Sequence, residues 1–265
     1  MRNSFRTAKK STHLTFSSGA GIAIVAPPPN PGLRLLLSLL LSYSAFAAYG
    51  PDLEGDLLAE GASSEPADTG VVGCSDQYLK DGVLLPDLPL FLTRVQPGHA
   101  WGTREMTDLL VDTSRHMRWL MPEADPISIG EISAEHGGFL QGHKSHRGGV
   151  DADVGLYMTG GRQNPRQFDT PGPGQFDVEA NWMLMASFLE SGKVDMILLD
   201  RGLIAKLKAY TLQAGLLSEE EANAIFLGDA HEGYQSVGVV RHAPSHEDHM
   251  HVRVLCPDGS KASAR

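Results

Sequence analysis

Residues 246–254 read HEDHMHVRV, and the alternation in this stretch decides the fold. Successive side chains of a β-strand point to opposite faces of its sheet. One set of alternate residues is apolar and would face a core: Met250, Val252 and Val254. The other set is polar: His249, His251 and Arg253. A strand that is apolar on one side and carries histidines on the other predicts a polar cleft supported by a sheet.

A second polar cluster, GHKSHRGGVDAD, occupies residues 142–153. In a strand over 151–157, Asp151 and Asp153 would share one face, opposite Ala152 and Val154. Imidazole and carboxylate together are ligands that suit zinc, and three protein ligands leave a fourth position for water. A lone H-x-H is a weak signal. The two clusters together predict a metal site of the catalytic kind.

The remaining histidines carry no such pattern. Four are interpreted as ordinary residues: His13, His116, His136 and His231. His99 and His242 are left open.

Apolar residues at helical spacing predict a helix that begins after Thr103, one from Asp177 to Gly192, and one around 203–210. Ser218 with Glu221 forms a capping box for a short fourth helix. Strands are expected at 126–132, 151–157, 194–199, 237–241 and 249–255. The Gly- and Pro-rich stretch 158–176 is expected to be an exposed loop.

Composition limits the classes of function. The chain has 265 residues, 42% of them hydrophobic, which excludes general disorder. Its net charge of -10 argues against a nucleic-acid partner, because phosphate contacts need a basic face. Its 2 cysteines exclude a disulfide-dense scaffold, and no C-x-x-C pair is present for a structural zinc.

The N-terminal region has the features of an export signal. It is basic, and the apolar run 35–46 is followed by the A-x-A site at Ala45 to Ala47, so residues 1–47 are interpreted as an extended signal peptide. The alternative is a membrane anchor, but the run of about 12–14 residues is shorter than the ~20 that span a bilayer. An acidic linker over 48–70, a domain over 71–258 and a disordered tail over 259–265 follow. No stable membrane span is expected after cleavage.

Two motifs carry a family resemblance: H-x6-D from His146 to Asp153, and H-x-H at His249 and His251. Together with their surroundings they resemble the penicillin-insensitive murein endopeptidase family, within the lysostaphin and D-Ala-D-Ala metallopeptidase group of zinc peptidases. The likeness extends over about residues 72–258. It implies an α+β fold in which a central antiparallel sheet carries the zinc site, flanked by helices and long loops. It also implies hydrolysis of peptidoglycan cross-links, typically the D-alanyl-meso-diaminopimelyl bond, in the periplasm.

The resemblance also implies roles for single residues. The zinc ligands, one ion per chain, would be His146, Asp153 and His251. His249 would handle the proton of the attacking water, with His246 as a second catalytic histidine. His143 and Asp151 would lie beside the metal, as supporting residues or as ligands of an additional metal.

The chain departs from the family pattern in several places. No histidine lies between Arg147 and Ala230, where some members have a further Asp and His. Ala243 stands where the family has an aromatic residue before its histidine motif. The family pairs the cysteines that match Cys74 and Cys256 with others that are missing here. Export to an oxidising compartment, in contrast, would favour a bridge between Cys74 and Cys256. Because these two arguments conflict, the sequence does not decide whether the bridge forms.

In the implied mechanism, zinc lowers the pKa of water to about 7 and polarises the peptide carbonyl, while a histidine transfers the proton. Arg253 would meet a substrate carboxylate or form a structural ion pair. No Ser-x-x-Lys or Gly-x-Ser-x-Gly motif supports a serine acyl-enzyme. Two alternatives stay open: a D,D-carboxypeptidase or dipeptidase of the same group, and a non-catalytic zinc-containing module that binds peptidoglycan. The oligomeric state and the exact cross-link are not specified.

Overall fold

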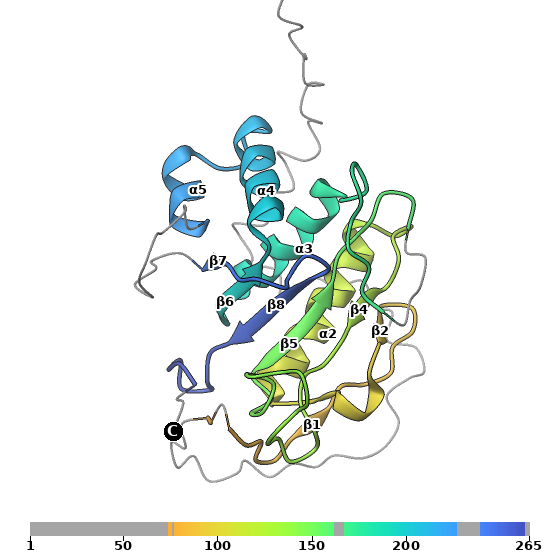
Figure 1. Ribbon diagram of the computed structural model, residues 1–265, viewed down its shortest axis with the longest axis vertical. Helices are drawn as coiled ribbons and strands as arrows, with labels where there is room; N and C mark the ends of the chain where they lie inside the picture. Colours follow the sequence, from red (N-terminus) through yellow and green to blue (C-terminus); the bar gives the residue numbers. More distant parts are fainter. Residues whose placement is uncertain (1–73, 76, 162–166, 227–238, 263–265) are drawn as a thin grey trace, which may run out of the picture.

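A six-stranded mixed sheet organises the domain in the computed structural model, which describes residues 74–75, 77–161, 167–226 and 239–262. The strands lie in the order β2-β4-β5-β8-β6-β7 (Figure 1). Their bounds are Leu92–Arg94 (β2), Ile127–Ile129 (β4), Asp151–Gly155 (β5), Val194–Leu199 (β6), Val240–His242 (β7) and His249–Val254 (β8). A separate two-stranded sheet joins Val83–Leu84 (β1) to Trp101–Gly102 (β3).

The centre of the large sheet is antiparallel, as predicted. β5 pairs antiparallel with β4 on one side and β8 on the other, and β8 pairs antiparallel with β6. The two edge pairs, β2 with β4 and β6 with β7, are parallel. The α+β class is therefore confirmed, with a sheet that is mixed rather than wholly antiparallel.

Four α-helices accompany the sheet in the described part of the chain, with bounds Arg104–Leu120 (α2), Val178–Glu190 (α3), Arg201–Gln213 (α4) and Glu219–Ile225 (α5). The caps follow the sequence. The Thr103 side chain accepts from the Met106 amide, the Asp177 side chain accepts from the Ala180 amide, and Ser218 with Glu221 forms the predicted capping box. None of the described helices is both long and apolar enough to cross a membrane.

One face of the central strands supplies the core. Its residues on β5 and β8 are fully buried: Ala152, Val154, Met250, Val252 and Val254. They belong to one apolar cluster with Met106 and Leu110 of α2 and with Met185 and Phe188 of α3. Figure 1 shows α2 and α3 behind the sheet. Because this face is committed to the core, the alternate side chains of β5 and β8 are held on the opposite face.

Several predicted boundaries change. The strand expected at 126–132 is shorter, and the strand expected at 237–241 is observed at 240–242, with residues 237 and 238 outside the described part. The strands β1, β2 and β3 were not predicted. The expectations for residues 1–47 and 48–70, for His13 and His231, and for the last three residues of the tail lie outside the described residues.

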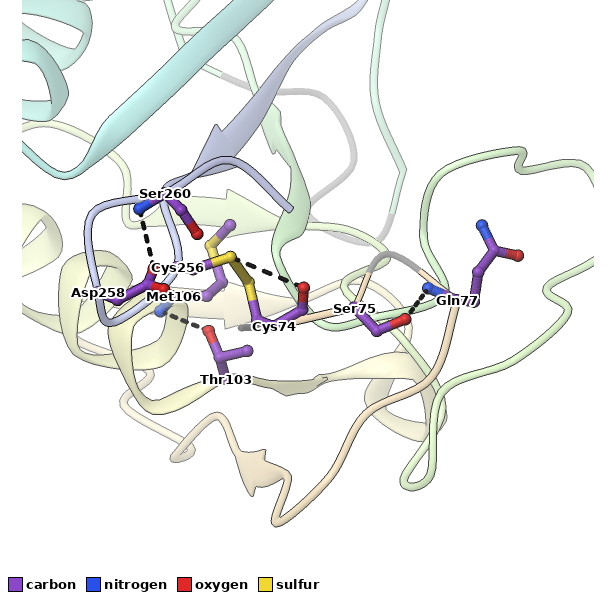
Figure 2. The surroundings of a disulfide bond; sticks show 8 residues. All are labelled: Cys74, Ser75, Gln77, Thr103, Met106, Cys256, Asp258 and Ser260. Carbon is purple, nitrogen blue, oxygen red and sulfur yellow. Dashed lines mark hydrogen bonds between the residues drawn. A yellow bond between two sulfur atoms is a disulfide. The ribbon is translucent and has the colours of Figure 1, made fainter. Parts of the chain in front are cut away.

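A disulfide joins Cys74 to Cys256, across a sequence separation of 182 residues (Figure 2). Cys256 lies just after β8, so the bridge ties the end of the central strand to the first described residue. The bond that the sequence left open is therefore present, and the described residues contain no free cysteine.

Removing this bridge should lower the stability of the domain strongly. A cross-link over so long a loop restricts the unfolded chain, and its loss typically reduces the free energy of unfolding by about 3–5 kcal/mol. We expect the Cys74→Ala/Cys256→Ala variant to melt roughly 6–20 °C below the oxidised wild type. Wild-type protein melted in reductant should match the variant. If reduced and oxidised wild type melt together, the bridge does not stabilise the domain.

Glu190, at the end of α3, makes stability depend on pH. Burial raises the pKa of this carboxyl to about 7. Since the folded protein then binds a proton that the unfolded chain releases between about pH 4.5 and 7, stability falls as pH rises through this window. Glu190→Gln keeps the side chain neutral, so the variant should equal wild type at pH 5 and melt higher at pH 8. The exposed Glu135→Gln is the control, and equal melting of wild type and Glu190→Gln at pH 8 would contradict the argument.

Candidate metal centre

Three cross-strand pairs between β5 and β8 form the base of the site. Asp153 lies opposite His251, Asp151 opposite Arg253, and Gly155 opposite His249. The side chains of Asp151, Asp153, His249, His251 and Arg253 lie on the face of the sheet opposite the apolar core. The predicted alternation is therefore confirmed on both strands, and pairing brings the two sequence clusters into direct contact.

Three side-chain atoms form a closely spaced triangle. His146 Nε2 lies 3.1 Å from Asp153 Oδ1 and 3.2 Å from His251 Nδ1, and His251 Nδ1 lies 3.0 Å from Asp153 Oδ1. All three residues are buried, with at most 4% of their surface exposed. Two imidazoles and a carboxylate are thus shielded from solvent, and their potential ligand atoms point toward one another.

The triangle fits the donor set and spacing of a zinc site. Nitrogen and oxygen ligands lie about 2.0–2.1 Å from zinc, so neighbouring ligands of a tetrahedron are roughly 3.3 Å apart. The observed separations are close to this value. His143 borders the triangle: its ligand atom, with those of His146 and Asp153, forms a group within 4.8 Å that could hold a metal. The described residues therefore contain a candidate metal-binding site made of histidine and aspartate.

The ring orientations of the two triangle histidines are set by their second nitrogens. His146 Nδ1 lies 3.2 Å from the Ile132 carbonyl, so it donates there and turns Nε2 toward the triangle. His251 Nε2 donates to Asp151 Oδ1 at 2.8 Å, which turns Nδ1 toward the triangle. Metal-binding histidines are commonly held in this way, by a carbonyl on one ring and a carboxylate on another.

Asp151 is completely buried and fully paired. Its carboxylate accepts from Arg253 Nε at 2.7 Å and from Arg253 Nη2 at 3.0 Å, in addition to His251. The guanidinium of Arg253 therefore forms the structural ion pair that the sequence left as one of two options. It anchors the carboxylate that holds His251.

The buried charges of the site support one another. Burial favours the neutral form of Asp153, but its interactions with His146 and His251 outweigh it and hold the pKa of this carboxyl well below its usual range. Burial likewise lowers the pKa of His251, yet its hydrogen bonds to Asp151 and Asp153 prevail and raise that pKa to about 9. In the metal-free protein a proton on His251 compensates the carboxylates, and a bound cation would take over this role.

His249 and His246 lie beside the triangle. His249 Nε2 is 3.6 Å from Asp153 Oδ1, while its Nδ1 donates to Asp248 Oδ1 at 2.7 Å. The His246 ring lies 4.8 Å from the His249 ring and 5.8 Å from the His251 ring, centroid to centroid. Its Nδ1 donates to the Pro244 carbonyl at 2.7 Å, and burial lowers its pKa. Two further imidazoles thus border the candidate metal site.

His143 forms the other border. Its Nδ1 lies 3.7 Å from Asp153 Oδ2, and its Nε2 lies 3.9 Å from Glu131 Oε1. Burial and the neighbouring His146 lower the pKa of His143. The structure therefore brings together all the residues that the sequence singled out around the motifs.

Other histidines lie elsewhere. His116 contacts Ser187, with 3.1 Å between Nδ1 and Oγ, where α2 meets α3, and His242 ends β7 in an exposed position. The sequence interpretation missed Asp248 and Glu131 as site residues. Asp248 lies within the histidine motif 246–251, so its position next to His249 could have identified it as a site residue. Glu131 lies within the strand expected at 126–132, two residues beyond the end of the observed β4, and was not singled out as a site residue.

A buried His/His/Asp group on a mixed sheet, with further histidines beside it, is the arrangement of a metal-dependent hydrolase. Residues 89–182 match the model of the penicillin-insensitive murein endopeptidase family. The match covers less than half of the 265-residue chain, so it is a similarity to a family of metallo-endopeptidases acting on murein. The matched segment includes His143, His146 and Asp153 and ends before β8. No curated protein matched the chain.

Proposed function

We propose that the chain is a zinc-dependent murein endopeptidase, which hydrolyses peptide cross-links of the D-alanyl-meso-diaminopimelyl type in the periplasm. The observation that carries the proposal is the triangle of His146 Nε2, Asp153 Oδ1 and His251 Nδ1, with edges of 3.0–3.2 Å. The similarity to the murein endopeptidase family supports peptidoglycan as the substrate.

In this proposal one zinc ion is held by His146, Asp153 and His251. When bound, the ion supplies Lewis acidity, which makes water nucleophilic near neutral pH and polarises the scissile carbonyl. The protein holds these ligands through the Ile132 carbonyl and the Asp151 carboxylate, each of which fixes one imidazole. Arg253 keeps Asp151 ionised and oriented. His143 supports the site from the side of Glu131.

His249 is the proposed proton-transfer residue. Its Nδ1–H donates to Asp248, which leaves Nε2 as the free nitrogen on the side of Asp153. A histidine in this position takes a proton from the attacking water and returns it to the leaving amine. His246, next to His249, offers a second imidazole, whose Nε2 can donate to the developing negative charge on the substrate when the ring is protonated.

Export is part of the proposal. The Cys74–Cys256 bridge is typical of proteins that fold in an oxidising compartment. It agrees with a cleaved signal peptide over 1–47, followed by a linker over 48–70 and a catalytic domain over 71–258.

The decisive experiment treats cross-linked muropeptides with the purified protein, with and without a chelator, and identifies the products by mass. We expect monomeric muropeptides, no reaction after chelation, and recovery on adding zinc. Release of terminal D-alanine from uncross-linked peptides alone would identify a carboxypeptidase. Binding without any product would identify a peptidoglycan-binding module. Metal analysis should find about one zinc per chain.

A further inference from the structure

A phenylalanine from the loop between β5 and α3 lies against the proposed proton-transfer residue. The Phe168 ring stacks on the His249 imidazole, with centroids 5.3 Å apart and planes 22° from parallel. Its stretch, 158–176, was expected to be an exposed loop, yet the Phe168 side chain is half-buried.

Two glycines leave the space that the ring occupies. A Cβ added to Gly155 would lie 3.0 Å from both Phe168 Cδ1 and Cε1, and one added to Gly130 would lie 2.7 Å from Phe168 Cζ. Gly155 is the cross-strand partner of His249, and Gly130 directly follows β4. The Phe168 ring therefore packs directly on the backbone of Gly155 and Gly130, at the ends of β5 and β4. A side chain at either glycine would displace the ring.

The stack restricts a movement that the hydrogen bond of His249 leaves free. The His246 ring is also near, with its centroid 4.8 Å away, but its plane is inclined by 40° and offers no parallel face. The β8 backbone fixes its Cα, and the hydrogen bond to Asp248 fixes Nδ1. A single hydrogen bond still allows the imidazole to tilt about the line between Nδ1 and its partner. A flat aromatic face parallel to the ring opposes this tilt, and the tilt decides where Nε2 points.

We infer that Phe168 is a positioning residue of the enzyme: it holds the imidazole plane of His249 so that Nε2 stays beside Asp153. The inference rests on the proposed function for its kinetic consequence, but the position of the ring can be tested without it. Small errors in the placement of a proton-transfer group slow catalysis, because the reacting atoms must already be aligned.

The first test compares Phe168→Ala and Phe168→Tyr in muropeptide hydrolysis. Loss of one aromatic pair should lower kcat about 3- to 10-fold, with zinc content unchanged and KM little affected. Tyrosine keeps the aromatic face and should restore most of the rate. Phe139→Ala is the matched control, because Phe139 is exposed on another loop and its ring contacts Arg147. An unchanged rate in Phe168→Ala would overturn the inference.

A double-mutant cycle separates positioning from direct substrate contact. If Phe168 acts through His249, adding Phe168→Ala to a His249→Ala background should cause no further loss of rate. An equal loss in both backgrounds would mean that Phe168 touches the substrate or supports the fold generally, and the positioning role would be rejected.

An NMR measurement tests the same point without any activity. In the zinc-loaded protein the His249 ring protons, assigned through the His249→Ala variant, should be shielded by the Phe168 ring. They should move downfield in Phe168→Ala and in Gly155→Ala, which displaces the ring without removing it. If wild type hydrolyses nothing, the proposed function fails while this result still decides the inference. Unchanged His249 signals in both variants would overturn it.

Discussion

Replacing His251 by alanine should empty the metal site and abolish hydrolysis. His251 supplies one corner of the ligand triangle, and its Nε2 is the link through which Asp151 stabilises that triangle. Loss of a partner that merely supports a metal ligand weakens binding about 10–100-fold. Loss of the ligand itself should therefore weaken zinc binding by more than about 100-fold. Metal analysis after dialysis, together with chelator competition, measures the effect.

His242→Ala is the control for the metal measurement. This residue is an exposed histidine at the end of β7, so removing it should leave zinc content and activity near those of wild type. His146→Ala should behave like His251→Ala. Full zinc content in either ligand variant would refute the proposed ligand set.

Replacing His249 by alanine should separate metal binding from catalysis. The variant should keep its zinc, because the triangle of His146, Asp153 and His251 stays intact. It should hydrolyse cross-linked muropeptides about 10²–10⁴-fold more slowly, the usual loss when a general acid or base is removed. Measured zinc content and initial rates on the same samples decide the matter.

The different contacts of His249 and His251 on β8 allow the two variants to be told apart. His249 and His251 project from the same face of one strand, yet only His251 reaches both Asp151 and Asp153 by hydrogen bonds. If His249→Ala loses zinc and His251→Ala keeps it, the two roles are exchanged. If His249→Ala retains nearly full rate, His249 transfers no proton in the reaction.

Local patterns predicted the faces of the site strands but not their pairing. Alternation of polar and apolar residues in 249–254 and 151–154 identified which side chains share a face, because this depends only on the strand period. The register that places Asp153 opposite His251 depends on how the core packs. Core packing involves residues far apart in the sequence, so no short segment predicts it. The ligand set came from a family resemblance for the same reason.

Other features left little signal in the sequence. The strands β1 and β3 have two residues each, too few to show alternation. Phe168 lies in a Gly- and Pro-rich stretch, where periodicity says nothing about contacts. The choice between a substrate contact and an ion pair for Arg253 required the position of Asp151 across the strand pair. The starts of α2, α3 and α5 were predicted well because a cap is made by residues two to three positions apart, whereas the Asp200 cap that begins α4 at Arg201 was not predicted.

The pairing of β5 with β8 also determines when the proposed site can form as the chain folds. The contact between His146 and His251 joins residues 105 positions apart, and β8 is the last strand described. A nascent chain that has not yet delivered β8 holds only two corners of the triangle and lacks His249. Closing so large a loop carries an entropic cost that local contacts do not offset, and such long-range pairing forms slowly. Under the proposed ligand set, a molecule that lacks β8 cannot assemble the metal site.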